Sequence, residues 1–373
     1  MRTVALLIDT ASSWGRGLLR GIAQYARDRA RWSFVLEPGG PEARPPARLG
    51  DVDGILALVR TRGDLRRLRK AGVPWVDLDF SLTGLAPWPV CVDEAAVADA
   101  ALDHLLARGL RHVAFVGWKT RTYWETARRR RLLQRHPGLR VYRERAGGWR
   151  ERQRALGRWL AALPRPSGVI AANDQRGRHV LEAARSAGLR LPDDLAVVGI
   201  DNDEVLCEMT VPPLSSVELN TARMGYEGAA LLDRRMSGRP VGRRPLRLPP
   251  LRVVARRSSD MLAVDDASVA AALRFLRENA HRPIRVADAV RAANVSRKTL
   301  ELRFRRTLGR TPHDELIGLR LERAADLLAR TDWPLKRVAA ASGFSYPEHL
   351  HAVFRQRKGT TPGEYRKALS SKP

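Results

Sequence analysis

Polar and charged residues collect directly after predicted strands in the first two-thirds of the chain. The residues that could face one another there are Asp9, Ser13, Trp14, Arg128, Asn173, Asp174 and Asp201. Ligands of open α/β sheets bind beyond the carboxyl ends of the strands, so we expect these side chains to line one pocket. Carboxylates accept hydrogen bonds from vicinal hydroxyls, Arg and Asn donate, and an aromatic ring covers the apolar face of a sugar ring. The pattern therefore predicts a sugar-binding site.

Several of these residues also have a purely structural interpretation. Asp9 could cap the helix that follows it, and Trp14 could pack within its own loop. Arg128 begins a run of four arginines, most of which must face solvent. Asp201 could act as a hinge residue where the chain crosses between lobes, a role that is compatible with ligand binding.

Residues 285–366 contain the same unit twice. Each copy is a short apolar helix, a tight turn and a second helix that carries a Phe on its buried face, Phe304 or Phe354. Asn294 and Gly343 stand in the two turns, where a positive φ is needed and Gly and Asn tolerate it best. Two helices joined in this way form a helix-turn-helix, whose second helix can enter the major groove of DNA.

The second helix of each unit presents polar residues that could read DNA. The predicted DNA-binding residues are Ser296, Arg297, Lys298, Thr299, Arg303, Tyr346, Glu348, His349 and Arg355. An Arg can make a bidentate contact to guanine, and a Glu can accept a hydrogen bond from cytosine N4. Ser296 is in addition a plausible N-cap. Between the two units, residues 312–330 are predicted to form one long helix with an apolar stripe.

Strands and helices alternate along residues 1–257, which indicates parallel sheets covered by helices on both faces. The predicted strands are 4–8, 32–36, 52–59, 73–78, 90–93, 112–117, 141–144, 168–172, 195–200, 214–217 and 251–254. The pattern restarts near residue 90, so we expect two α/β lobes. An all-α domain with the two helix-turn-helix units follows them.

Both halves of the chain resemble known families. The motifs Ser-Arg-Lys-Thr-Leu (296–300) and Thr-Thr-Pro-Gly-Glu-Tyr-Arg (360–366) resemble the AraC/XylS family of transcription regulators. Residues 113–117, 171–174 and 197–201 resemble the type I periplasmic-binding-protein fold of LacI/GalR sensor domains. In those sensor families the residues matching Arg128, Asp174 and Asp201 contact the effector.

The resemblance implies a domain organisation. It assigns residues 1–257 to a sugar-sensing periplasmic-binding-like domain, 258–266 to a linker and 267–373 to the AraC-type DNA-binding domain. A sensor followed by an AraC-type domain resembles the regulators of xylose operons. This implies an activator that binds double-stranded DNA as a homodimer, with D-xylose as the favoured effector and RNA polymerase as a further partner. The residues themselves do not exclude another aldose.

The formal net charge of +27 suggests a polyanionic partner, but charge does not locate its site. Residues 267–373 hold 22 Lys and Arg against 10 Asp and Glu, a net of +12, so +15 lies elsewhere. Much of the charge is arginine in an alanine-rich chain, a composition that also fits a GC-rich genome.

Several function classes lack their sequence signatures. No apolar run reaches the length of a membrane span, and the first residues lack the features of a signal peptide, so we expect a cytoplasmic protein. Cys91 and Cys207 have no metal-ligand spacing, and no catalytic motif occurs, so we expect no metal, no cofactor and no enzymatic activity. The alternative that remains open is a cytoplasmic sugar-binding receptor that does not bind DNA and acts through a protein partner.

Overall fold

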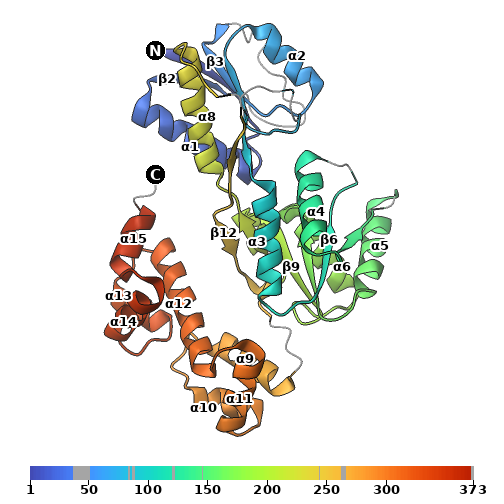
Figure 1. The fold of residues 1–373 in the computed structure, drawn as a ribbon, viewed down its shortest axis with the longest axis vertical. Coiled ribbons are helices and arrows are strands. Elements are labelled where there is room, and N and C mark those ends of the chain that lie inside the picture. The colour runs from blue at the N-terminus through green and yellow to red at the C-terminus, as the bar shows by residue number, and fades with distance from the viewer. Residues whose placement is uncertain are drawn as a thin grey trace. The chain divides into compact units, whose positions relative to one another are not determined.

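The computed structural model describes residues 1–36, 51–82, 85, 89–119, 122–144, 146–242, 244–261 and 266–370. The chain divides into two compact units, Met1–Met261 and Leu262–Pro373 (Figure 1). The first unit is α/β, and every element described in the second unit is a helix. The predicted loop 37–49 and part of the predicted linker (262–265) lie outside the described residues.

The first lobe of the first unit is built on a parallel sheet in the order β2-β1-β3-β4. Its strands are β1 (Arg2–Leu7), β2 (Trp32–Leu36), β3 (Gly54–Ala57) and β4 (Trp75–Asp77). Its helices are α1 (Ser13–Arg29), α2 (Arg62–Ala71) and α8 (Thr221–Met236). Ile55 packs on Leu65 and Leu68 of α2, whereas Val4, on the opposite face of the sheet, is also fully buried. Burial on both faces explains why these strands are continuous apolar runs in the sequence.

The second lobe is a six-stranded sheet in the order β12-β10-β9-β8-β6-β7, in which β12 runs antiparallel to β10. Its strands are β6 (His112–Val116), β7 (Arg140–Tyr142), β8 (Ser167–Ala171), β9 (Leu195–Asp201), β10 (Ser215–Glu218) and β12 (Arg252–Val254). Its helices are α3 (Glu94–Leu106), α4 (Tyr123–Arg135), α5 (Trp149–Ala161), α6 (Asp174–Ser186) and α7 (Glu204–Glu208). The sequence analysis did not identify the short helix α7.

Two short strands form a separate parallel pair where the chain passes between the lobes. These are β5 (Val90–Val92) and β11 (Leu246–Leu248), and the chain crosses once more between β10 and α8. The strand β11 was not predicted, because it lies in a stretch rich in Pro and Arg and itself contains only two apolar residues, Leu246 and Leu248. The predicted two-lobed periplasmic-binding-protein fold is confirmed.

The second unit contains two helix-turn-helix units, α10–α11 and α13–α14, joined by α12 (Figure 1). Its helices are α9 (Ala267–Asn279), α10 (Val286–Ala293), α11 (Arg297–Leu308), α12 (Pro312–Arg330), α13 (Leu335–Ala341), α14 (Pro347–Lys358) and α15 (Pro362–Ser370). Each helix-turn-helix has its own core: Leu300 and Phe304 lie in one, and Leu350 and Phe354 in the other, all four fully buried.

The two turns have the backbone geometry that the sequence predicts. Asn294 has a φ of 50° and Gly343 a φ of 82°. The Ser296 hydroxyl accepts a hydrogen bond from the Thr299 backbone N–H at 3.1 Å, so Ser296 caps α11. These local features fix where each reading helix starts.

Gly343→Ala should destabilise the second unit more than Gly359→Ala. Both glycines have a positive φ, which costs an L-residue about 1–2 kcal/mol. A Cβ at Gly343 would also lie 2.1 Å from the carbonyl oxygen of Ala280, whereas a Cβ at Gly359 meets no atom within 4 Å. Urea unfolding of the full chain, followed by far-ultraviolet circular dichroism, measures both losses. Equal losses would show that the contact with Ala280 does not limit stability.

Candidate functional site

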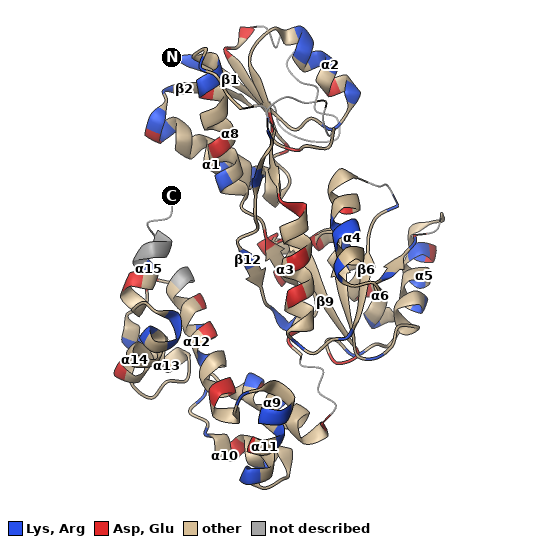
Figure 2. Ribbon diagram, in the orientation of Figure 1, with Lys and Arg blue, Asp and Glu red and all other residues tan. Residues whose placement is uncertain are grey.

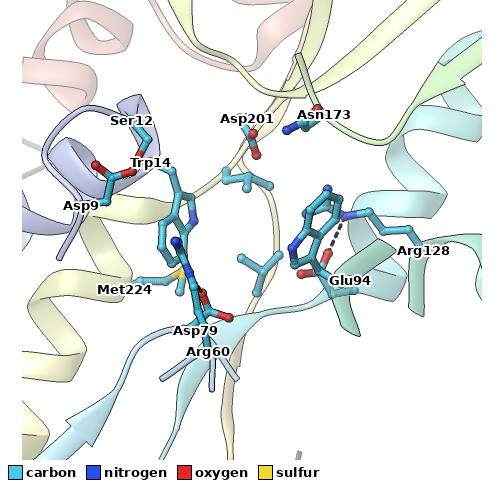
Figure 3. Close-up of a pocket in the computed structure, with 13 residues that line it drawn as sticks. Asp9, Ser12, Trp14, Arg60, Asp79, Glu94, Arg128, Asn173, Asp201 and Met224 are labelled. Carbon is cyan, nitrogen blue, oxygen red and sulfur yellow. Dashed lines mark hydrogen bonds and ion pairs between the residues drawn. The ribbon is translucent and has the colours of Figure 1, made fainter. Parts of the chain in front are cut away.

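A pocket in the first unit is lined by residues of both lobes (Figure 3). Its lining residues are Asp9, Ser12, Trp14, Arg60, Asp79, Val92, Glu94, Trp124, Arg128, Asn173, Asp201, Leu219 and Met224. Most of the polar ones stand at or just beyond the carboxyl end of a strand. The topology therefore gathers them, since parallel strands present these ends at the same edge of a sheet.

Five of the seven predicted effector-binding residues line this pocket, namely Asp9, Trp14, Arg128, Asn173 and Asp201. Ser13 does not, and its neighbour Ser12 takes that place. The Ser12 hydroxyl also accepts a hydrogen bond from the Gly15 backbone N–H at 3.1 Å, so Ser12 is the N-cap of α1. An N-cap side chain turns back over the first turn of its helix. The first turn of α1 lies at the pocket, so the Ser12 side chain reaches it.

Asp174 lies behind the pocket instead of lining it. Its carboxylate accepts hydrogen bonds from the Ser216 hydroxyl at 2.5 Å and from the Asp203 backbone N–H at 2.7 Å, and the residue is 1% exposed. Burial, followed by the negative charge of Asp201, raises the pKa of Asp174 well above its usual value. Asp174 therefore supports the turn after β9 and does not line the pocket.

Arg128 is the buried cation of the pocket. Its Nε donates to Glu94 Oε2 at 2.6 Å and its Nη1 to the Ala172 carbonyl at 2.7 Å. The Trp124 ring lies on the guanidinium, with its centroid 4.8 Å from Cζ. Both members of the ion pair are buried, and burial raises the pKa of Glu94 despite the neighbouring Arg128. The pair thus holds the start of α3, helix α4 and the end of β8 together.

Asp201 stands where β9 ends, on a strained backbone. Its φ is 113° and that of the next residue, Asn202, is 50°. Burial raises the pKa of Asp201 to about 7, Arg128 opposes this shift, and Glu94 and Asp203 add to it. The carboxyl group of Asp201 can therefore gain or lose its proton near neutral pH.

Several lining residues were missed by the sequence analysis, among them Arg60, Asp79, Glu94 and Trp124. Asp79 follows β4 and Glu94 follows β5, so the rule that placed Asp9 and Asp201 applies to them equally. Arg60 pairs with Asp79 at 3.0 Å. Figure 3 shows this pair next to Trp14, with Arg128 and Glu94 on the other side of the pocket.

The pocket suits a neutral ligand that carries many hydroxyl groups. It presents four carboxyl groups, Asp9, Asp79, Glu94 and Asp201, against two guanidinium groups, Arg60 and Arg128. An anionic ligand would add to an existing excess of acidic groups. Hydroxyls can donate to the carboxylates and accept from the cations, and the indoles of Trp14 and Trp124 offer flat apolar surface. Within the described ranges, no group of three His, Cys, Asp or Glu is arranged to hold a metal ion.

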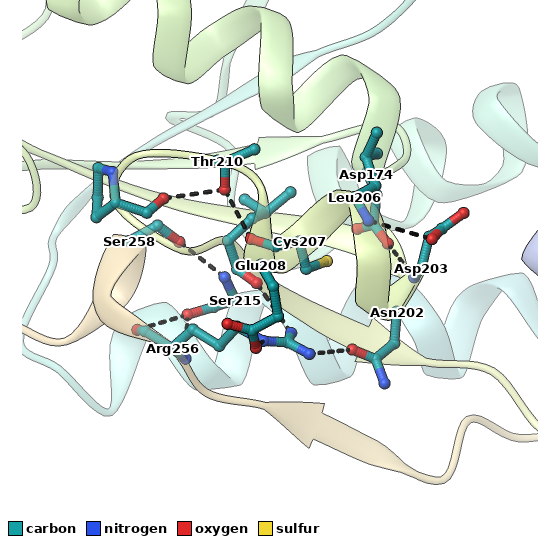
Figure 4. Close-up of polar contacts among 12 residues, drawn as sticks. Asp174, Asn202, Asp203, Leu206, Cys207, Glu208, Thr210, Ser215, Arg256 and Ser258 are labelled. Carbon is teal, nitrogen blue, oxygen red and sulfur yellow. Dashed lines mark hydrogen bonds and ion pairs between the residues drawn. The ribbon is translucent and has the colours of Figure 1, made fainter.

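A hydrogen-bond network joins the turn after β9 to the last residues of the first unit (Figure 4). The Arg256 side chain is 7% exposed and donates to Asn202 Oδ1 and to the Leu214 carbonyl, both at 3.0 Å. Ser258 then donates to the Val197 carbonyl at 2.6 Å, and Ser259 to the Ser215 hydroxyl at 2.7 Å.

The end of the first unit includes residues that the sequence analysis assigned to the linker. Arg257–Ser259 form a short 3-10 helix, and both Ser258 and Ser259 are fully buried. Their hydroxyls satisfy buried carbonyl and hydroxyl groups, which a composition-based reading of a polar stretch does not reveal.

The predicted DNA-binding residues lie on or next to the second helices of the two helix-turn-helix units. All of them are exposed except Thr299, which is half-buried. Two of the arginines are already engaged: Arg297 pairs with Glu301 at 2.9 Å, and Arg303 donates to the Ser268 hydroxyl at 2.9 Å. Arg303 therefore points towards the start of α9. Lys and Arg are spread over both units (Figure 2), so charge by itself does not mark the reading surface.

Two family models match the chain. A periplasmic binding protein-like domain matches residues 102–259, and a helix-turn-helix domain matches residues 289–368. Within the described residues, no helix is long and apolar enough to cross a membrane.

Two of the similar proteins cover nearly the whole chain, and a third covers a smaller share of it. The xylose operon regulatory protein of Haemophilus influenzae is 29% identical over 97% of this chain and 97% of its own length. The protein of the same name from Escherichia coli K12 is 28% identical over 97% and 96%. The transcriptional regulator CelR of Thermobifida fusca is 30% identical over 63% of this chain and 75% of its own.

Solved structures show the same relationship. The structure of the xylose-binding transcription activator xylR has a TM-score of 0.66 and 28% identity, and the match covers 98% of each chain. The complex of the transcriptional regulator CelR with cellobiose has a TM-score of 0.55 and 26% identity, over 69% of this chain and 84% of its own. The first of these similarities extends through both units.

Arg128→Met should strongly destabilise the first unit, because it leaves Glu94 buried without its cation. Breaking a buried ion pair by removing one partner costs about 3–5 kcal/mol. The matched control is Arg131→Met on the same helix, whose partner is Asp99 in a partly exposed pair, and which should lose about 1 kcal/mol or less. Urea unfolding followed by tryptophan fluorescence measures both. The double variant Arg128→Met/Glu94→Gln should recover part of the loss, and no recovery would contradict this account of the pair.

Proposed function

Because the chain belongs to the transcription regulators in which a periplasmic binding protein-like domain precedes an AraC-type helix-turn-helix domain, we propose that it controls transcription in response to a sugar. The family identifies it as a DNA-binding regulator and not an enzyme, as the sequence predicts. The second unit reads double-stranded DNA, and the first unit binds the effector.

The polar pocket of the first unit is the observation that carries the sugar assignment. It offers carboxylates as acceptors, guanidinium groups as donors and indole rings as flat apolar surface, in one place lined by both lobes. D-xylose is the effector that we propose first, since the relatives that match nearly the whole chain are named xylose operon regulatory proteins. The pocket chemistry applies to other aldoses as well, so a sugar panel is the appropriate test.

A bound sugar that contacts both lobes would favour their closed arrangement. An effector can shift such an equilibrium only by its difference in affinity for the two states. Asp201 is part of the pocket, and the adjacent Asn202 is hydrogen-bonded to Arg256 near the end of the first unit. This network offers a route from the pocket to the segment that leads into the DNA-binding unit.

The regulator acts in the cytoplasm as a homodimer. Each subunit carries two reading helices, so a dimer would present four of them to successive major grooves. Activation of sugar-catabolism genes, with RNA polymerase as a further partner, is the behaviour that the named activator among the similar structures suggests.

D-xylose should raise the Tm of the purified full chain more than other pentoses and hexoses do. A ligand that binds only the folded state stabilises it in proportion to the logarithm of its concentration. Asp201→Ala should weaken binding by about tenfold or more, because it removes an acceptor inside the pocket. The matched control is Asp193→Ala, an exposed acid of the same lobe outside the pocket. If only another sugar raises the Tm, that sugar is the effector. If none of the sugars raises the Tm, the sensor assignment is overturned.

The same titration has an expected pH dependence. With the pKa of Asp201 raised to about 7, the folded protein retains this proton at mildly acid pH. An ionised carboxylate is the stronger acceptor for hydroxyl groups, so sugar binding releases the proton and the affinity rises between pH 6 and pH 8. Asp201→Asn should remove this rise. A pH profile that is unchanged in this variant would assign the rise to another group.

Lys298→Ala and Arg355→Ala should each weaken DNA binding by about tenfold, because both side chains are exposed on reading helices. Arg303→Ala should have a smaller effect, since the Arg303 guanidinium is held by Ser268. Arg274→Ala, an exposed arginine on α9, is the matched control. Fluorescence anisotropy on a duplex selected by this protein from a random pool gives the affinities. Equal losses for all four variants would indicate attraction by overall charge instead of groove reading.

A further inference from the structure

The side chain of Asn173 is fixed in one orientation at the edge of the pocket. Its Oδ1 accepts a hydrogen bond from the Arg176 backbone N–H at 3.0 Å, which caps α6. The same oxygen accepts from Trp118 Nε1 at 3.3 Å. A carboxamide oxygen has two acceptor sites, so both are used. The Nδ2 group, a donor, is what remains for a ligand, and Figure 3 shows Asn173 beside Asp201 at the pocket.

Trp118 does not line the pocket, but its own position is firmly held. It follows β6, and its backbone N–H donates to Glu125 Oε2 at 3.2 Å. The guanidinium of Arg176 lies over its ring, 5.0 Å from the centroid, and His179 meets the ring edge-on at 5.5 Å.

Arg176 is in turn anchored in the interior of the second lobe. It is 3% exposed and pairs with Glu144 at 3.1 Å. Its guanidinium also lies 5.7 Å from the ring centroid of Tyr142 on β7. The indole N–H of Trp118 is therefore directed at Asn173 by packing that extends from the edge strand of the sheet.

We propose that Trp118 is a positioning residue that makes Asn173 an obligatory hydrogen-bond donor to the bound sugar. The inference rests on the proposed function of the pocket. With both acceptor sites of Oδ1 occupied, the sugar oxygen that faces Asn173 must accept a hydrogen bond. The neighbouring carboxylate of Asp201 has the opposite requirement, since it accepts hydrogen bonds from hydroxyls. Together these two residues select a ligand that places a hydrogen-bond acceptor at Asn173 and a hydrogen-bond donor at Asp201.

Trp118→Phe removes the indole N–H and also shrinks the side chain, so a Trp-to-Phe change elsewhere in the lobe is needed as a control for the lost volume. In Trp118→Phe, the Asn173 oxygen regains a free acceptor site and the carboxamide loses one of its two anchors. A ligand hydroxyl can then donate to Asn173 as well as accept from it. The expected result is a loss of discrimination at one ligand position, with a smaller effect on overall affinity.

The test compares D-xylose with its monodeoxy and monodeoxyfluoro analogues by isothermal titration calorimetry on the full chain. If the panel identifies another aldose, the analogues of that sugar are used. A fluorine can accept weakly but cannot donate, so a position that tolerates fluorine better than hydrogen is one where the protein donates. In the wild type, one position should show this preference at about tenfold, the size of a single hydrogen bond. In Trp118→Phe the preference at that position should fall to about twofold or less.

Two further variants separate positioning from packing. Trp159→Phe changes a partly buried tryptophan of the same lobe that contacts Tyr142, and it should leave the analogue profile unchanged. Asn173→Asp keeps an oxygen for the α6 cap and for Trp118 but replaces the donor by an acceptor, so it should abolish the fluorine preference. The Tm of each variant without sugar shows whether the fold is intact.

Three results would overturn the proposal. The analogue profile of Trp118→Phe could match that of the wild type, or this variant could weaken every ligand by one common factor, which indicates packing alone. Retention of the fluorine preference by Asn173→Asp would also exclude Asn173 as the donor. If the wild type binds no sugar at all, the proposed function fails and this inference fails with it. If the wild type binds a sugar and the variants keep its analogue profile, only this inference fails.

Discussion

Burial of the Arg128–Glu94 ion pair is the constraint on which the pocket depends. The guanidinium comes from α4, the carboxylate from the first turn of α3, and the Ala172 carbonyl that completes the set from the residue after β8. An unpaired charge at this depth would cost several kcal/mol, so the three elements are held in register by the need to keep the pair together. Because Arg128 is paired with Glu94 and Arg60 with Asp79, the other two acids of the pocket, Asp9 and Asp201, have no ion pair of their own among the lining residues. Burial of Asp201 raises its own pKa to about 7. A ligand that brings hydroxyl donors suits these acidic groups best.

Much of the fold followed from apolar periodicity, and much of the pocket followed from a single topological rule. Polar groups after parallel strands meet at one edge, and Asp9, Asn173 and Asp201 do line one pocket there. The rule does not say which of two adjacent residues turns outward. In the pair Asn173 and Asp174, the N-cap geometry keeps Asn173 at the surface of the pocket while Asp174 turns inward to Ser216. Which of the two side chains faces the pocket depends on local hydrogen-bond geometry, and a sequence pattern does not contain that geometry.

The pocket residues that the sequence did not predict were missed for a common reason. Arg60 and Glu94 depend on partners far away in the chain, and each is in the pocket because its pair closes there. In the helical unit the contacts that matter are local, so the turn residues and the ends of α12 were predictable. Arg303 illustrates the limit of that locality. It lies on a reading helix, yet its guanidinium donates a hydrogen bond to Ser268 on α9, 35 residues earlier in the chain.

The strained turn after β9 is held by the same hydrogen bonds that reach the end of the first unit. A residue other than Gly with a φ of 113°, as Asp201 has, costs about 1–3 kcal/mol and persists only where its surroundings fix it. Those surroundings are the bonds from Asn202 to Ser216 and Arg256 and from Asp203 to Asp174. The conformation of the pocket residue Asp201 therefore depends on a turn that Arg256 helps to hold. Because Arg256 leads into the short 3-10 helix that ends the first unit, the turn that carries Asp201 and this end segment belong to one hydrogen-bond network.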